Sequence, residues 1–153
     1  MPADAPGAAS STTPVVLDTN LVVSAIIAPH GMAAQALAVA LQAFEPVISH
    51  ETLAELADVL SRPKFDRYLA ADTRKLLLQD YAEAARIVAI PPDADPVTDC
   101  ADARDNKFLL LAKVCQARLL VTGDKRDLLV MHPWRGVAIM GIRDFVEHWR
   151  QWA

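Results

Sequence analysis

Short runs of consecutive apolar residues alternate along this chain with longer segments in which apolar residues recur at helical spacing. The run Val15–Leu17 is the clearest short one, and it leads directly into the polar residues Asp18, Thr19 and Asn20. Consecutive apolar residues, several of them β-branched, are typical of a parallel strand that is covered on both faces. The other strands that this pattern predicts are Pro46–Ser49, Ile87–Ile90, Arg118–Val121 and Val137–Met140.

Helical segments are predicted between these strands. Within the longest of them, Leu76, Leu77 and Tyr81 belong to a set of apolar residues that recurs at helical spacing. Since strands and helices alternate, the pattern predicts a parallel sheet with right-handed crossovers and helices on both faces. The predicted helices are Asn20–Ala28, Met32–Phe44, His50–Ser61, Phe65–Leu69, Ala71–Val88, Asp105–Gln116 and Ile142–Trp152, with a single helical turn at Asp127–Met131.

The length of 153 residues suits one domain with a full-sized core. We expect a flexible tail over residues 1–13, which are mostly Ala, Pro, Ser, Thr and Gly and lack the basic and apolar regions of a signal peptide. The domain is then expected over residues 14–153. The longest apolar stretches, such as Leu21–Ala28, are far too short to span a membrane, so no membrane partner is expected.

Composition and charge narrow the possible functions. A hydrophobic content of 53% with 22% charged residues indicates a compact protein. The net charge of −4 argues against a broad basic surface for nucleic acid, but a metal-dependent nuclease would itself carry clustered acids. Cys100 and Cys115 form no CxxC pattern, so a zinc site is not expected and a reducing, cytoplasmic setting is the simplest interpretation.

Four acidic residues stand at positions that a parallel sheet would bring toward one edge. Asp18 and Asp124 follow predicted strands, Asp105 opens a predicted helix, and Glu55 lies in the first half of another. Ligands bind at the carboxyl edge of such sheets, and Asp18 and Asp124 would face one crevice if their strands were neighbours at the switch point. Oxygen ligands suit Mg²⁺ or Mn²⁺, which activate water and neutralise the charge of a phosphodiester.

Each of these acids also has a purely structural interpretation. Asp18 could cap the following helix, Glu55 could be a solvated helix acid, and Asp124 could be a turn residue. Asp102 and Asp105 could be acids at a helix N-terminus, which the helix dipole favours. The convergence of four positions is more informative than any single one.

Four stretches together resemble the PIN-domain family, and within it the VapC-like toxin components of toxin–antitoxin pairs. They are Val15–Ile26, Ser49–Phe65, Asp99–Ala112 and Leu119–Leu129, in the family's order. The resemblance implies a three-layer α/β/α sandwich with a central, mostly parallel five-stranded sheet. It also implies a Mg²⁺- or Mn²⁺-dependent endoribonuclease that cleaves single-stranded RNA or a structured RNA loop.

The resemblance also assigns residues. The catalytic, metal-binding quartet of the family falls on Asp18, Glu55, Asp105 and Asp124, and Asn20 and Thr122 fall on the polar residues that support it. The chain departs from the family pattern at two places. Ala101 and Ala103 stand where Arg and Pro are common, and the last motif is one residue longer than usual. Whether Asp102 and Asp127 also contact the metal is therefore open.

Partners follow mainly from the same resemblance. Basic residues that flank the motifs could contact RNA or could be solvated surface. A small antitoxin that inserts a basic residue into the acidic crevice, and a homodimer, are also implied. The basic residues are Arg104, Lys107, Lys125 and Arg126, with Lys64 as a further candidate.

Three rival functions remain at this point. A phosphatase of the haloacid dehalogenase type would carry a second acid at the position of Asn20, and a phosphorylated receiver domain would carry a Lys after a late strand, where Met140-Gly141-Ile142 stands here. The third rival is a metal-binding interaction module without nuclease activity.

Overall fold

The structure is a computed structural model that describes residues 12–124 and 126–153. The expected tail over residues 1–13 therefore lies outside the described residues, except for its last two positions. At Thr13 the backbone carbonyl already accepts a hydrogen bond from the Glu45 amide at 2.8 Å, so the chain is tied to the sheet from this residue on.

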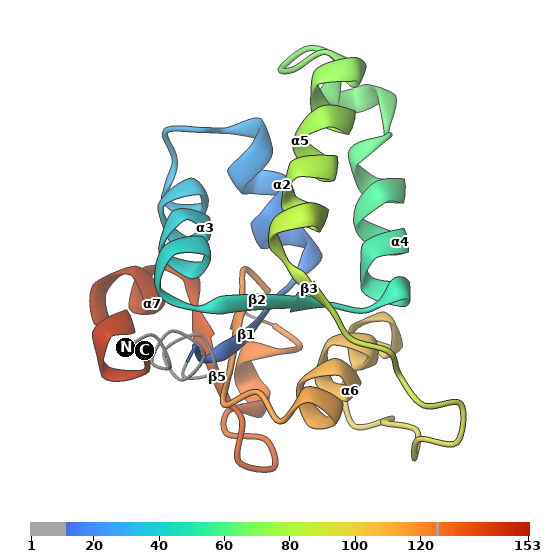
Figure 1. Cartoon of the computed structure of the whole chain (residues 1–153), viewed down its shortest axis with the longest axis vertical. Coiled ribbons are helices and arrows are strands. Elements are labelled where there is room, and N and C mark those ends of the chain that lie inside the picture. The colour runs from blue at the N-terminus through green and yellow to red at the C-terminus, as the bar shows by residue number, and fades with distance from the viewer. Residues whose placement is uncertain (1–11, 125) are drawn as a thin grey trace, which may run out of the picture.

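A five-stranded, all-parallel sheet forms the centre of the molecule (Figure 1), as the alternating pattern predicts. The strand order is β3-β2-β1-β4-β5, so the chain builds outward from β1 in one direction and then returns to build in the other. The topological switch point therefore lies between the paired strands β1 and β4. The strands are β1 Pro14–Leu17, β2 Glu45–Ile48, β3 Arg86–Ile87, β4 Leu119–Thr122 and β5 Ala138–Gly141.

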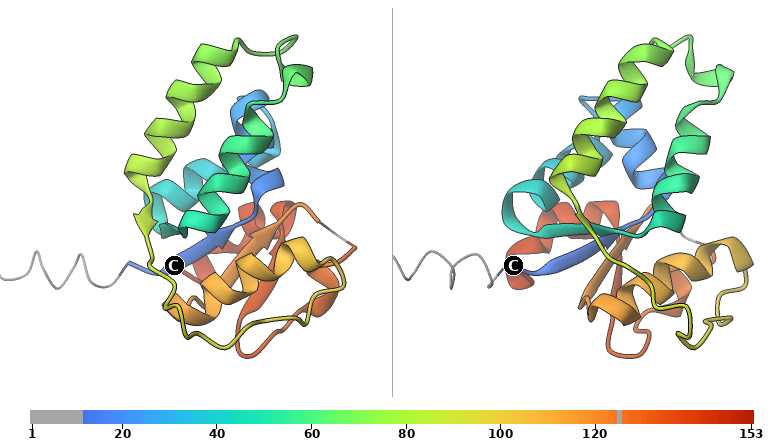
Figure 2. Two further views of the ribbon diagram at one scale, coloured as in Figure 1. Left: turned by 90° about the vertical axis from the view of Figure 1, so that its right-hand side faces the viewer. Right: turned by 45° about the vertical axis from the view of Figure 1, so that its right-hand side comes forward.

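Helices cover both faces of the sheet and complete the three layers. Val15 and Leu17 of β1 pack into the core layer formed with α2, α3 and α7, whereas Val16 points into the layer formed with α6. Figure 2 shows α6 beneath the sheet and the α4–α5 pair rising from its other side. The helices are α2 Thr19–Ile27, α3 Met32–Ala43, α4 His50–Leu60, α5 Ala71–Ala84, α6 Asn106–Cys115 and α7 Ile142–His148.

The main departures from the predicted elements lie between α4 and β3. The predicted helix Phe65–Leu69 is replaced by one 3₁₀ turn, η1 Pro63–Phe65, followed by hydrogen-bonded turns. The predicted helix Ala71–Val88 ends at Ala84, and the third strand is only two residues long. Leu76 and Leu77 are 61% and 36% exposed, because α5 stands away from the sheet and turns only part of its apolar set toward the core. The spacing of apolar residues predicted that this segment is helical, but it did not predict how much of the helix other elements would cover.

Smaller shifts occur near the other ends. The predicted helical turn Asp127–Met131 is the 3₁₀ turn η3 Leu129–Met131, and the predicted last helix breaks after His148 into the 3₁₀ turn η4 Trp149–Gln151. A short 3₁₀ turn, η2 Ala103–Asp105, precedes α6. None of these shifts moves an acid of the predicted quartet to another edge of the sheet.

No single helix among the described residues is long and apolar enough to cross a membrane. By length and composition alone, α2 and α3 pass such a test only as a pair, and that pair is bent by 109°.

Candidate active site

Asp18 lies at the switch point, directly after β1 and beside the end of β4. Its backbone amide donates to the Val121 carbonyl at 3.2 Å, so the two strands hold the residue in register. The side chain is 3% exposed, and its Oδ1 accepts from the Leu21 amide at 3.0 Å as the N-cap of α2. Its Oδ2 accepts from Thr122 Oγ1 at 2.5 Å. Asp18 therefore caps α2 and also lines the cleft described below, so its structural role as a helix cap does not exclude a role in the site.

Burial sets the electrostatics of Asp18. Desolvation raises the pKa of this carboxyl above its usual range, although the hydrogen bonds from Thr122 and Leu21 act in the opposite direction. The charge of Asp124 nearby raises the pKa further. A buried carboxylate among other acids is costly to hold without a compensating cation.

All four acids of the predicted quartet line one cleft of about 520 Å³. Asp18 and Asp124 enter it from the ends of β1 and β4, Glu55 from the middle of α4, and Asp105 from the residue before α6. Asn20 also lines the cleft but is exposed, and the described residues show no hydrogen bond from its side chain to a carboxylate.

Asp105 and Asp124 are close enough to share a proton. Desolvation, the hydrogen bond with Asp124 and the charges of Asp102, Asp124 and Asp18 raise the pKa of Asp105 to about 7. Desolvation would also raise the pKa of Asp124, but the backbone amides of Asp127 and Arg126 and the hydrogen bond from Asp105 lower it instead. The pair therefore shares one proton, which it loses as pH rises through about 7.

Glu55 is held at both of its oxygens rather than solvated. Thr19 Oγ1 donates to Oε2, and Lys107 Nζ lies 2.7 Å from Oε1 with only 15% of its side chain exposed. Thr19 is a site residue that the sequence analysis did not single out. It stands between Asp18 and Asn20, and the helical turn that α2 begins directs Thr19 into the interior while Asn20 faces solvent.

A family model described as PIN domain matches residues 14–126 of this chain. The chain belongs to the PIN-domain family. This PIN domain is 30% identical over 118 residues to the uncharacterised protein MJ1680 of Methanocaldococcus jannaschii, across 75% of this chain and 72% of that protein.

Two solved structures share the fold of this PIN domain. One is the crystal structure of VapBC2 from Rickettsia felis bound to a DNA fragment from their promoter, in which 98% of the matched chain and 84% of this chain are covered, with a TM-score of 0.57 and 16% identity. The other is DNA-bound VapBC from Salmonella typhimurium, with 99% and 86% covered, a TM-score of 0.57 and 16% identity. The predicted membership of the PIN-domain family is thus confirmed, and the likeness to VapBC chains is one of fold.

Asp102 and Asp127, whose contact with the metal the sequence left open, lie close to the quartet. Carboxylate oxygens of Asp102, Asp105 and Asp127 come within 4.8 Å of one another. Asp102 also caps η2 through the Arg104 amide at 3.0 Å, and its hydrogen bonds with Arg104 lower its pKa. Asp127 is thus near Asp105 but is not part of the cleft lining, whereas Asp102 belongs to both groups.

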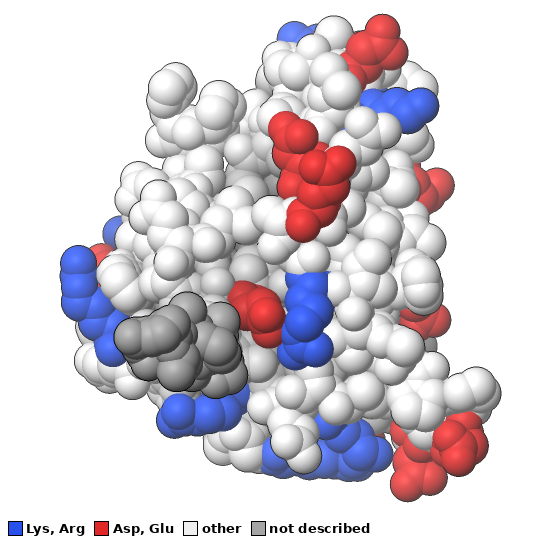
Figure 3. Space-filling view, viewed as in Figure 1, with Lys and Arg blue, Asp and Glu red and all other residues white. Residues whose placement is uncertain are grey.

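Two of the basic residues proposed to contact RNA, Arg104 and Lys107, are already paired with acids. Arg104 pairs with Asp102 at 3.0 Å, and Lys107 pairs with Glu55. Arg126 is exposed, and its amide supports Asp124, whereas Lys125 lies outside the described residues. On the face drawn in Figure 3, charged side chains appear singly or in small groups of either sign, without a broad basic surface.

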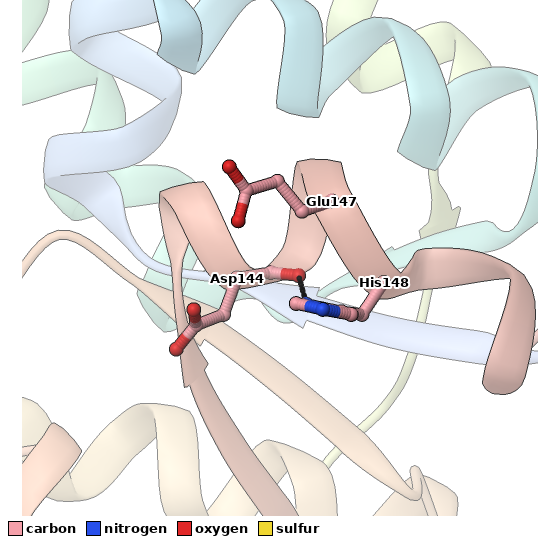
Figure 4. A group of neighbouring side chains, drawn as sticks. All are labelled: Asp144, Glu147 and His148. Atoms are coloured by element: carbon pink, nitrogen blue, oxygen red, sulfur yellow. Dashed lines mark hydrogen bonds between the residues drawn. The ribbon is translucent and has the colours of Figure 1, made fainter.

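A second group of side chains of the kinds that bind metals lies on α7, outside the cleft. Asp144, Glu147 and His148 follow one another around this short helix (Figure 4), and all three are exposed. His148 Nδ1 donates to the Asp144 backbone carbonyl at 3.1 Å. Because these residues are exposed and none of them lines the cleft, a substitution among them is a control for the loss of an acid outside the cleft.

Proposed function

We propose that this protein is a Mg²⁺- or Mn²⁺-dependent endoribonuclease that cleaves single-stranded RNA, and that it is the toxin of a toxin–antitoxin pair. The observation that carries the proposal is the convergence of Asp18, Glu55, Asp105 and Asp124 in one cleft at the switch point of a PIN domain. This arrangement has the donor atoms that a hard divalent cation requires and the location at which open α/β sheets bind ligands.

The carboxylates fit such a cation chemically. They offer oxygen ligands only, and two of them hold a shared proton that compensates part of their mutual repulsion. Asp18, Asp105 and Asp124 would hold one or two ions directly or through water, and Glu55 would orient water or bind a second ion. A Mg²⁺ or Mn²⁺ ion held by these carboxylates would supply an acidified water molecule and positive charge beside the phosphate.

The chain's own side chains have separate tasks in this proposal. Thr122 and the N-terminus of α2 fix the two oxygens of Asp18, so that its position does not depend on substrate. Thr19 fixes Glu55, which can then accept a hydrogen bond from the attacking water and orient it toward the phosphorus. Attack of the water in line with the P–O3′ bond would break that bond, as the family resemblance implies, and would leave a 5′-phosphate and, once the departing oxygen takes up a proton, a 3′-hydroxyl.

The proposal includes partners. The solved structures similar in fold are VapBC complexes, which supports a small antitoxin as partner of this chain. A basic antitoxin side chain would find the acidic cleft complementary. We also propose a homodimer and a cytoplasmic location, the latter in keeping with two free cysteines. An interaction module without nuclease activity is the alternative.

The test is cleavage of a labelled single-stranded RNA by purified protein in Mg²⁺, in Mn²⁺ and in EDTA. Asp18→Asn retains an N-cap acceptor but removes the charge, and Asp144→Asn removes an exposed acid from α7 as the matched control. We expect metal-dependent cutting by the wild type and the control but not by Asp18→Asn. If calorimetry shows Mn²⁺ binding that Asp18→Asn abolishes while no RNA is cut, the site stands and the interaction module replaces the nuclease. Absence of metal binding would end the proposal.

A further inference from the structure

The cleft has a second wall, which comes from the connection between α4 and α5. Arg62, Lys64 and Phe65 of this connection line the same cleft as the four acids. We call these three residues the α4–α5 wall. The cleft thus combines a carboxylate centre with a cationic and aromatic border, and the acidic centre alone gives no reason for that border.

Of the two cationic side chains in the α4–α5 wall, one is paired with an acid and the other has no ion pair among the described residues. Arg62 pairs with Asp58 at 3.4 Å. Arg104, which lines the cleft but is not part of the wall, pairs with Asp102. Lys64 is exposed, and among the described residues it has no ion pair; its Nζ lies 5.1 Å from the centre of the Phe65 ring. Phe65 itself is half-buried and packs against the core, so its ring is held in place at the border of the cleft.

A buried arginine fixes the backbone beneath this wall. Arg74, in the first turn of α5, is 1% exposed. Its guanidinium donates to the carbonyls of Leu60 at 2.7 Å, Arg62 at 3.4 Å and Leu69, and it pairs with Asp66 at 2.9 Å. Burying a guanidinium is costly unless its donors are satisfied, and here backbone oxygens at both ends of the connection satisfy them. The wall is therefore pre-organised, which reduces the entropy lost when it binds a ligand.

We propose that the α4–α5 wall binds the substrate strand beside the cleaved phosphate, with Phe65 stacking on an unpaired base and Lys64 contacting a backbone phosphate. This inference rests on the proposed ribonuclease function and assigns its substrate subsite. Unpaired bases expose faces that stack on aromatic rings, whereas bases within a duplex do not, so the wall favours single-stranded RNA. Arg74 is a positioning residue that acts through the wall.

The connection also contains its own control pair. Arg67 lies 5.2 Å from the Tyr68 ring centre, which repeats the arrangement of Lys64 and Phe65, but neither residue lines the cleft. Phe65→Leu keeps an apolar side chain against the core while removing the aromatic face, and Tyr68→Leu is its matched control. Lys64→Gln is matched by Arg67→Gln.

The experiment measures binding of a short, fluorescently labelled single-stranded RNA by anisotropy, in an Asp105→Asn background that prevents cleavage. Phe65→Leu is expected to weaken binding about tenfold, in the range typical of lost base stacking. Lys64→Gln is expected to weaken binding and to lower the slope of log K against log salt by about 0.7, as expected for one lost phosphate contact to a single strand. Tyr68→Leu and Arg67→Gln should bind as the background does.

A second measurement addresses Arg74 in the active enzyme. Arg74→Lys keeps the charge but cannot reach all the carbonyls at once, so we expect a raised KM with a largely retained kcat and a native circular dichroism spectrum. A fall in kcat alone would contradict a positioning role through the wall. If the wild type cuts RNA but Phe65→Leu and Lys64→Gln bind like their controls, the subsite is refuted while the function stands. If the wild type neither cuts nor binds RNA, the proposed function fails and the subsite fails with it.

Discussion

The proton held between Asp105 and Asp124 predicts how Mn²⁺ binding depends on pH. The pKa of Asp105 is about 7 in the metal-free protein, first because of desolvation and then because of the hydrogen bond with Asp124 and neighbouring negative charges. A carboxyl group must lose its proton to act as a metal ligand, so Mn²⁺ and the proton compete for the same oxygen atoms.

The magnitude follows from this pKa. Competition multiplies the apparent Kd by about elevenfold at about pH 6, by about twofold near pH 7, and hardly at all near pH 8. Affinity should therefore rise about tenfold over this interval, whereas a carboxyl with its usual pKa near 4 would give almost no change. The number of protons released per Mn²⁺ should fall from about 0.9 to about 0.1 over the same interval.

The assay is isothermal titration calorimetry of Mn²⁺ into metal-free protein, in buffers of different ionisation enthalpy. Asp58→Asn is the control, because Asp58 lines the same cleft but is exposed and paired with Arg62; its profile should match that of the wild type. A Kd that is constant from about pH 6 to about pH 8, with no release of protons into the buffer, would refute the shared proton.

The same proton makes the free energy of unfolding of the metal-free protein depend on pH, and the pKa of Asp105 fixes the direction of that dependence. The pKa of Asp105 is higher in the folded protein than in the unfolded chain, so the folded state binds the proton more tightly between about pH 4 and about pH 7. The contribution of Asp105 to stability is full below that interval and is lost as pH rises through about 7. Saturating Mn²⁺ should consequently raise the Tm more at about pH 8 than at about pH 6.

Three further substitutions test how the site is supported. Arg74→Met should lower the free energy of unfolding in urea by about 2–4 kcal/mol, because three backbone carbonyls lose a charged donor; a loss below about 0.5 kcal/mol would show that water replaces the guanidinium. Tyr81→Phe should leave stability unchanged or raise it by up to about 1 kcal/mol, because the buried hydroxyl has no partner among the described residues, and a clear loss would reveal one. Thr19→Val should lower kcat for RNA cleavage about tenfold at unchanged stability, since it releases one oxygen of Glu55, the residue proposed to orient the attacking water; an unchanged kcat would mean that the contact with Lys107 alone is enough to hold Glu55 in place.

The parallel sheet and its carboxyl edge were predictable because buried parallel strands leave a strong local signal. The β1 and β4 segments are continuous apolar runs that end in polar residues, and the structure places Asp18 and Asp124 at their adjacent ends. The rule that parallel strands end at one edge is enough to place both acids at that edge. That β1 and β4 are neighbours there is a long-range contact, which the sequence left as a condition and the structure supplies.

The supporting contacts were not predictable for the opposite reason, because each joins residues far apart in the chain. Thr19 meets Glu55 across 36 positions, and Lys107 meets Glu55 across 52. Nothing local to Lys107 distinguishes it from a solvated cation, and nothing local to Arg74 distinguishes it from an exposed residue of an amphipathic helix. The partial exposure of Leu76 shows the same limit, since periodicity defines a helical face but not what will cover it.

The charges of the four quartet acids are compensated in three different ways in the metal-free protein. Asp18 accepts from the first turn of α2 and from Thr122, Asp105 and Asp124 share a proton, and Glu55 pairs with the cation of Lys107. Only the shared proton can leave without a structural change. The bonds to Asp18 come from the helix N-terminus, the Gly123 amide and a buried hydroxyl, which the fold holds in place, and they leave one lone pair of its carboxylate free. Metal binding should therefore begin with the loss of that proton, and Asp18, Asp105 and Asp124 would then hold the cation while Glu55 keeps its pair with Lys107.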